Sequence, residues 1–161
     1  AARHLREAHG SARVLVVAWG TRPADAIRQV LAGDPGVAVL SIHAQPDAPV
    51  EPRRSDAAVP AGSDGTAFGR AMADALNAIP PEESPDFVLL SAGFDILAAD
   101  PLGGLCVTPH QVHGLTLALR EWAEARAGGR LVSVLEGGWD ASAIGAAVVQ
   151  HLRALAGLPA A

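Results

Sequence analysis

An acidic residue directly after a long apolar run is the first candidate for chemistry in this sequence. Residues 87–92 (FVLLSA) are apolar enough for one strand buried on both faces, and the chain breaks at Gly93 before Asp95. Side chains just past the carboxyl ends of parallel strands are where open α/β sheets bind their ligands. Asp95 is therefore a candidate ligand-binding residue, although an aspartate at this position could also simply cap the loop or the next helix.

Other reactive side chains are scattered and give weaker signals. His110 and His113 are three residues apart on an expected helix, a spacing that can bind metal. No carboxylate completes that pattern, so we interpret them as histidines on a solvent-exposed helix surface. We expect the single cysteine, Cys106, to be a small buried hydrophobic residue.

Two further pairs could bind an anion. Arg53 and Arg54 are adjacent, but neighbouring arginines are usually just solvated. Gly137 and Gly138 precede an expected helix, yet the chain has no GxGxxG pattern, which leaves only a weak signal.

Four apolar runs predict the scaffold that must position these candidates. Each is long enough for a strand of a parallel sheet, and helical patterns lie between them. We predict one α/β domain over residues 1–161, with three layers in which helices cover both faces of a parallel sheet of about four strands. Residues 44–65 contain four prolines and are expected to form a long irregular surface loop. The predicted strands are 13–19, 37–42, 87–92 and 130–135, and the predicted helices are 1–9, 24–32, 66–79, 109–127 and 141–156.

The composition excludes several classes of protein. Half of the residues are hydrophobic and 18% are charged, which is typical of a globular chain and not of a disordered one. No apolar run approaches the ~20 residues of a membrane-spanning helix. A net charge of −5 and a pI near 5.6 argue against general nucleic-acid binding. A lone cysteine fits a reducing cytoplasm, the expected location, and the missing initiator methionine indicates a processed chain or a fragment.

Four passages carry a resemblance to a known family. They are SAGFD with ADPLGGL and TP (residues 91–109), LEGGWD (135–140), RVLVVAWG (13–20) and AVPAGSDG (58–65). Together they resemble the histone deacetylase and acetylpolyamine amidohydrolase family. The resemblance covers essentially this whole chain but only about the latter half of the family's domain. It implies a partial arginase/deacetylase-like fold and, for an intact member, a zinc amidohydrolase acting on acetylated amines.

The departures from the family pattern bear directly on chemistry. The resemblance implies that Asp95 is the one retained zinc-ligand position, because Gly20 and Arg22 stand where the family has two other ligands. Trp139 stands at the position of the family's catalytic tyrosine, Leu97 where a histidine often lies, and His43 at a structural position. A hydrolytic zinc site needs three protein ligands and an open position for water. We therefore expect no bound cofactor, no confident catalytic residue and an inactive pseudoenzyme.

The vacated site has an expected geometry of its own. Arg22 and Asp95 would lie at the ends of neighbouring strands, so we expect them to form an ion pair. The rim of the old pocket would comprise Arg22, Gly93, Phe94, Gly137 and Gly138.

The resemblance also implies a strand order and a free edge. The four strands would be ordered 130–135, 87–92, 13–19, 37–42, which is 4-3-1-2, and strand 130–135 would be an exposed apolar edge. Such edges recruit partners, so we expect a homo-oligomer or a partner chain there, with no nucleic acid and no membrane. A non-enzymatic protein-interaction or small-ligand module on the same fold is the alternative function. A flavodoxin-like anion or nucleotide binder is disfavoured because the sequence contains no phosphate loop.

Overall fold

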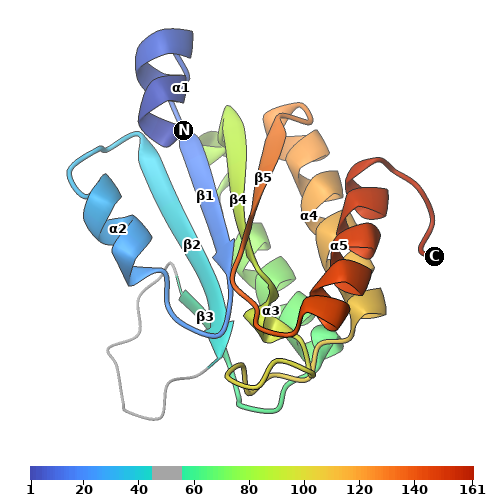
Figure 1. Ribbon diagram of the computed structural model, residues 1–161. Helices are drawn as coiled ribbons and strands as arrows, with labels where there is room; N and C mark the ends of the chain where they lie inside the picture. The colour runs from blue at the N-terminus through green and yellow to red at the C-terminus, as the bar shows by residue number, and fades with distance from the viewer. Residues whose placement is uncertain (45–55) are drawn as a thin grey trace.

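The architecture is a five-stranded parallel sheet between two layers of helices (Figure 1), seen in a computed structural model that describes residues 1–44 and 56–161. The strands are ordered β3-β2-β1-β4-β5, and every neighbouring pair runs parallel. The strands are β1 (Val14–Trp19), β2 (Val37–Ala44), β3 (Asp56–Val59), β4 (Phe87–Gly93) and β5 (Leu131–Glu136). The helices are α1 (Ala2–His9), α2 (Asp25–Leu31), α3 (Gly65–Asn77), α4 (Pro109–Ala127) and α5 (Ala141–Leu155), with short 3₁₀ turns η1 (Pro81–Glu83) and η2 (Phe94–Ile96).

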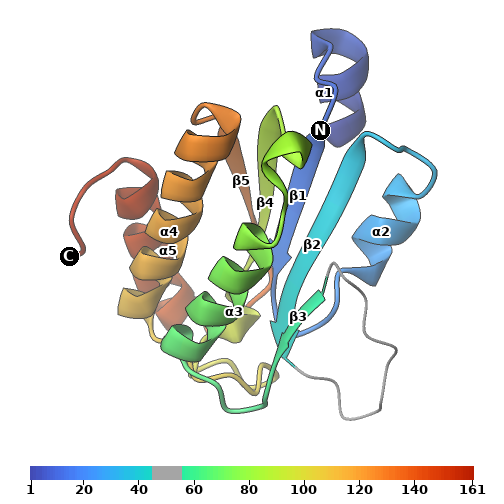
Figure 2. The ribbon, with the colours of Figure 1, turned by 180° about the vertical axis from the view of Figure 1, so that it is seen from behind.

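The two faces of the sheet bury different sets of side chains. Leu15, Val17 and Leu90 point into the main core, which α3, α4 and α5 cover (Figure 2). Val14 and Val16 point the other way, into a smaller cluster beneath α1 and α2. Burial on both faces explains why the central strands read as continuous apolar runs and do not alternate with polar residues.

The predicted strand order is confirmed for the four predicted strands, but the count is wrong. The fifth strand, β3, lies inside segment 44–65, which was predicted to be irregular. It pairs in parallel with Ser41–Ala44 at the end of β2, two residues beyond the predicted end of that strand. The sequence DAAV has only one β-branched residue, so this short strand depends on the open edge of β2 more than on its own propensity. Arg53 and Arg54 lie outside the described residues.

The helix boundaries follow local capping chemistry. The side chain of Thr108 accepts a hydrogen bond from the backbone N–H of Gln111, and Oε1 of Gln111 accepts one from the backbone N–H of Thr108. Pro109 opens α4. Gly128 ends α4 in the left-handed conformation that favours glycine. Asp64 caps α3 by accepting from Thr66 and Ala67, and the hydrogen bond from Ala67 is the main reason that the pKa of this carboxyl is lowered. Among the described helices, none is long and apolar enough to cross a membrane.

Candidate functional site

The carboxyl ends of β1, β4 and β5 meet around a hollow of about 230 Å³. The parallel register brings these ends together, since Trp19 is level with Ala92, and Gly93 with Glu136. The charged side chains that line the hollow are Arg22, Asp95 and Glu136. The structure thus brings Asp95 to the edge of the sheet where parallel α/β folds bind ligands.

Asp95 is held in place by the residue that follows β1 by two positions. Thr21 donates twice to Oδ2 of Asp95, from its hydroxyl at 2.6 Å and from its backbone N–H at 3.2 Å. The other carboxylate oxygen, Oδ1, is buried and has no hydrogen-bond partner among the described residues. A buried oxygen without a partner is uncommon because the lost hydration is not replaced. This oxygen is therefore a buried acceptor that remains available to a ligand.

The predicted ion pair between Arg22 and Asp95 is wrong. Among the described residues no ion pair joins them, and Arg22 is exposed. Thr21 lies within hydrogen-bond distance of Asp95 and supplies both a hydroxyl and a backbone donor, so the carboxylate needs no guanidinium. Arg22 still lines the hollow and adds a positive charge to it.

Glycines shape the walls of the hollow. A Cβ atom on Gly93 would lie 2.6 Å from the carbonyl oxygen of Trp19 and 2.9 Å from Oδ1 of Asp95, so the close approach of β1 and β4 requires glycine there. A Cβ on Gly20 would instead lie 3.4 Å from Oδ1 of Asp95, an ordinary contact. A side chain at position 20 is therefore sterically possible and would start beside Asp95. Gly137 also borders Asp95, with φ of 67°, a conformation that favours glycine.

The remaining residues predicted for the rim lie elsewhere. Phe94 is buried in the core beside His151, and a Cβ atom on Gly138 would lie 2.8 Å from Ile144 and 3.2 Å from Phe94. Trp139 has a side chain that is 72% exposed. Its backbone N–H donates to Oδ2 of Asp100 at 2.7 Å, so Asp100 anchors the loop after β5.

The histidines and the cysteine considered from sequence do not join this hollow. His43 is buried, with Nδ1 2.7 Å from the carbonyl oxygen of Ala44 and Nε2 3.9 Å from Asp56. His110 is exposed as expected, but His113 is buried and its Nε2 lies 2.8 Å from the carbonyl oxygen of Leu158. The C-terminal segment therefore covers His113, which the helix pattern alone could not show. Cys106 is exposed, so the expectation of a buried cysteine is wrong.

A buried polar network involving His151 was missed from sequence. The hydroxyl of Thr116 donates to the carbonyl oxygen of Val112 at 2.8 Å, so it accepts from Nδ1 of His151 at 2.7 Å. Nε2 of His151 then accepts from the hydroxyl of Ser133 at 2.9 Å. Burial lowers the pKa of His151 to about 4, so the imidazole is neutral at neutral pH. Because its members come from α4, β5 and α5, no spacing in the sequence could have revealed it.

The comparison that decides the family is with a family model. The model described as "Histone deacetylase domain" matches residues 1–155. The chain belongs to the histone deacetylase family. It is 33% identical over 178 aligned residues to "Polyamine deacetylase HDAC10" of Homo sapiens, covering 99% of this chain and 26% of that protein. It is 27% identical over 169 residues to "Histone deacetylase 14, chloroplastic" of Arabidopsis thaliana, covering 98% of this chain and 40% of that protein.

A solved structure shows the same fold. The structure of the histone deacetylase Clr3 matches with a TM-score of 0.76 and 24% sequence identity, over 98% of this chain and 29% of that one. The histone deacetylase segment described here therefore spans well under half the length of each of these relatives.

The zinc that the resemblance implies does not fit the residues present. In the described part of this histone deacetylase segment, no group of three or more His, Cys, Asp or Glu side chains could hold a metal ion. Asp95 already accepts two hydrogen bonds through Oδ2, Gly20 offers no donor atom, and Arg22 carries a permanent positive charge. One free carboxylate oxygen falls short of the three protein ligands of a hydrolytic zinc site.

Proposed function

We propose that this histone deacetylase-like segment is catalytically inactive, binding no zinc and deacetylating no substrate. The observation that carries the proposal is the lone carboxylate, whose Oδ1 faces a glycine where a second ligand would be needed. Hydrolysis in such a site needs a metal to polarise the scissile carbonyl and activate water. Arg22 opposes a cation in the same hollow, and the exposed Trp139 has no phenol to stabilise a developing oxyanion.

The test measures metal and turnover together. The purified chain, loaded with zinc and then mildly chelated, should retain only a small fraction of one zinc per molecule by elemental analysis. It should also release no acetate from acetyl-lysine peptides or acetylated polyamines. Close to one zinc per chain, or turnover that a chelator abolishes, would contradict the proposal.

A matched pair of variants shows that the assay can detect a site. Gly20→Asp with Arg22→His restores a carboxylate and an imidazole next to Asp95, and position 20 has room for a Cβ atom. We expect zinc retention to rise in this double variant and not in Gly20→Ala with Arg22→Ala, which removes the positive charge without adding donors. If zinc retention rises above that of the parent chain by the same amount in both variants, then the charge of Arg22, and not the missing ligands, excludes the metal.

The alternative, a non-enzymatic interaction module, has an observation of its own in its favour. The edge strand β5 exposes about half of three large apolar side chains, since Val132 is 47% exposed, Val134 51% and Leu135 46%. Isolated apolar residues on a surface are common, but three of them on one strand at the edge of the described sheet favour association.

A further inference from the structure

A single buried carboxylate connects two loops at the carboxyl edge of the sheet. Asp100, in the segment between η2 and α4, is only 8% exposed. Its Oδ1 accepts a hydrogen bond from the backbone N–H of Leu102 at 2.9 Å, and its Oδ2 accepts one from the backbone N–H of Trp139 at 2.7 Å. Unlike Asp95, which keeps one oxygen without a partner among the described residues, Asp100 therefore uses both oxygens. One of its two hydrogen bonds crosses from the loop after β4 to the loop after β5.

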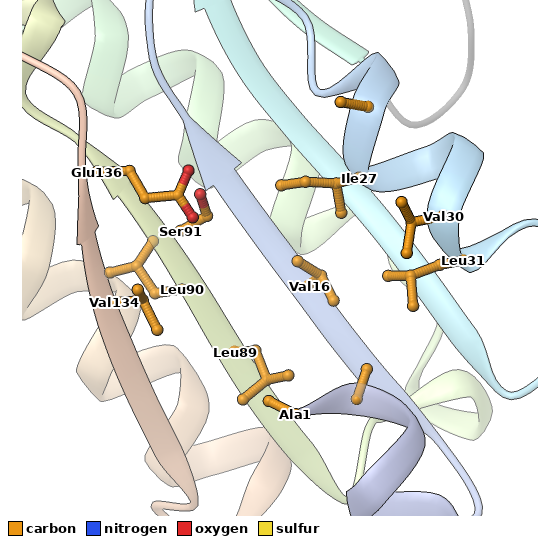
Figure 3. A pocket seen from close by; sticks show the side chains of 12 residues that line it. Ala1, Val16, Ile27, Val30, Leu31, Leu89, Leu90, Ser91, Val134 and Glu136 are labelled. Carbon is orange, nitrogen blue, oxygen red and sulfur yellow. The ribbon is translucent and has the colours of Figure 1, made fainter.

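The loop after β5 depends on contacts of this kind for its course. Glu136, the last residue of β5, lines the hollow between β5 and α2 together with Ser91 (Figure 3). The chain then passes through Gly137 and Gly138, which have φ angles of 67° and 95°. Glycine adopts such conformations readily but adopts many others as well, so two glycines in succession do not specify one path. The path therefore depends on tertiary contacts, and the hydrogen bond to Asp100 is the one made by the backbone of Trp139 itself.

The loop after β4 holds Asp100 firmly. The backbone N–H of Asp100 donates to the carbonyl oxygen of Leu97 at 2.9 Å. Gly103 lies so close to this loop that a Cβ atom on it would collide with the carbonyl oxygen of Asp95 and would lie 3.2 Å from Cβ of Asp100. Asp100 is thus packed within the same short segment that carries Asp95. Its carboxylate links the backbone of Trp139 to that segment.

We propose that Asp100 is a positioning residue, whose carboxylate fixes the side chain at position 139 relative to Asp95. A carboxylate suits this role because each of its oxygens accepts from a different N–H group, whereas a neutral amide has only one oxygen. Hydrogen bonds to an ionised acceptor are also roughly twice as strong as those between neutral groups. A site works only when supporting groups hold its side chains in a defined geometry. The family resemblance implies a catalytic position at 139, so the placement of this residue bears on function whether or not the present chain is active.

A purely local role for Asp100 makes a different prediction. Aspartate often accepts from the backbone N–H two residues further on and so stabilises its own turn, as Asp100 does with Leu102. If this were its whole role, removal of the carboxylate would disturb Leu102 and leave Trp139 as it is. The behaviour of Trp139 therefore distinguishes the two roles.

Hydrogen exchange of the full chain tests the contact without any variant. The backbone amide of Trp139 should exchange at least about tenfold more slowly than in an unstructured peptide, because it donates to a buried carboxylate. Nuclear magnetic resonance measures this rate for the single amide. Exchange at the unprotected rate would overturn the proposal.

Fluorine resonances of the three tryptophans read the position of the side chain. The chain is labelled with 5-fluorotryptophan, and the resonance of Trp139 is assigned by its loss in Trp139→Phe. Asp100→Ala should shift and narrow this resonance, because the loop loses its link to the segment of Asp95. Trp19 and Trp122 lie on β1 and α4, away from this hydrogen bond, and should keep their resonances.

Asp86→Ala is the matched control. Asp86 also accepts from the backbone N–H of a distant residue, Arg13, at 2.8 Å, but it lies at the amino ends of the strands. This variant should leave the resonance and the amide exchange of Trp139 unchanged. Asp100→Asn retains one acceptor oxygen, so protection should persist at only one of the two amides, that of Leu102 or that of Trp139. An unchanged Trp139 resonance in Asp100→Ala, or equal shifts of all three resonances, would refute the positioning role.

Discussion

Two polar groups near the carboxyl ends of the strands differ in how completely they are hydrogen-bonded. His151 is fully buried, and both of its ring nitrogens have partners, Thr116 and Ser133. Asp95 has one oxygen that accepts two hydrogen bonds from Thr21 and one buried oxygen that accepts none. The satisfied group needs nothing beyond the chain, as is expected of a structural network. The unsatisfied group keeps one oxygen that can accept a hydrogen bond from a group outside the described residues.

The largest expected effect tests the structural role of His151 through pH. Between about pH 6.5 and pH 4 the unfolded chain binds a proton on this imidazole and the folded chain does not, so stability falls as the pH falls through this window. At 1.36 kcal/mol per pKa unit, the loss reaches roughly 3 kcal/mol by pH 4. Urea unfolding at a series of pH values measures it.

His151→Gln and His110→Gln are the matched controls for this measurement. His151→Gln should remove most of the fall in the free energy of unfolding between about pH 6.5 and pH 4. His110 is exposed, so His110→Gln should leave that fall unchanged. The lowered pKa of Asp64 also makes stability fall as the pH falls, but this contribution is present in all three chains and cancels in the comparison. If the free energy of unfolding of His151→Gln falls with pH as steeply as that of the parent chain, other groups cause the loss of stability in acid. The contrast between His151 and Asp95 would then lose its support.

The next prediction compares two glycines beside Asp95, one closely packed (Gly93) and one with room for a side chain (Gly20). Gly93→Ala should lower the free energy of unfolding by about 1–3 kcal/mol, because the new methyl group collides with the carbonyl oxygen of Trp19. Gly20→Ala should change it by less than about 0.5 kcal/mol, since its Cβ meets only ordinary contacts. Thermal or urea unfolding of both variants measures the two changes in the free energy of unfolding. Similar losses in the two would mean that position 20 has no room for a restored ligand.

The smallest effect concerns the Asp95 carboxylate itself. Asp95→Asn keeps an oxygen that can accept from Thr21 and removes a charge with an unpartnered oxygen. We expect the free energy of unfolding to change by less than about 1 kcal/mol, with a gain as the expected sign, since residues placed for function often reduce stability. Equilibrium unfolding at pH 7 measures it. A loss above about 2 kcal/mol would show that Asp95 is structural and erase its contrast with His151.

The sequence alone predicted the features that depend on neighbours along the chain. Continuous apolar runs identified four strands, because burial on both faces leaves that pattern. Thr108 and Gly128 correctly marked the ends of α4, since capping is decided within one turn of the chain. The same interpretation placed Asp95 directly after β4. That Gly20 and Arg22 stand at two further ligand positions is implied by the family resemblance and stays a prediction.

Tertiary structure decided everything that depends on distant residues meeting. β3 forms because β2 extends far enough to offer it an edge, and His113 is covered because the C-terminal segment returns over α4. The partner of Asp95 is Thr21, not Arg22, and Ser133 reaches His151 only because β5 and α5 pack together. Such contacts depend on side-chain direction and on which hydrogen-bond partner lies nearest in space. The periodicity of the sequence carries no record of either.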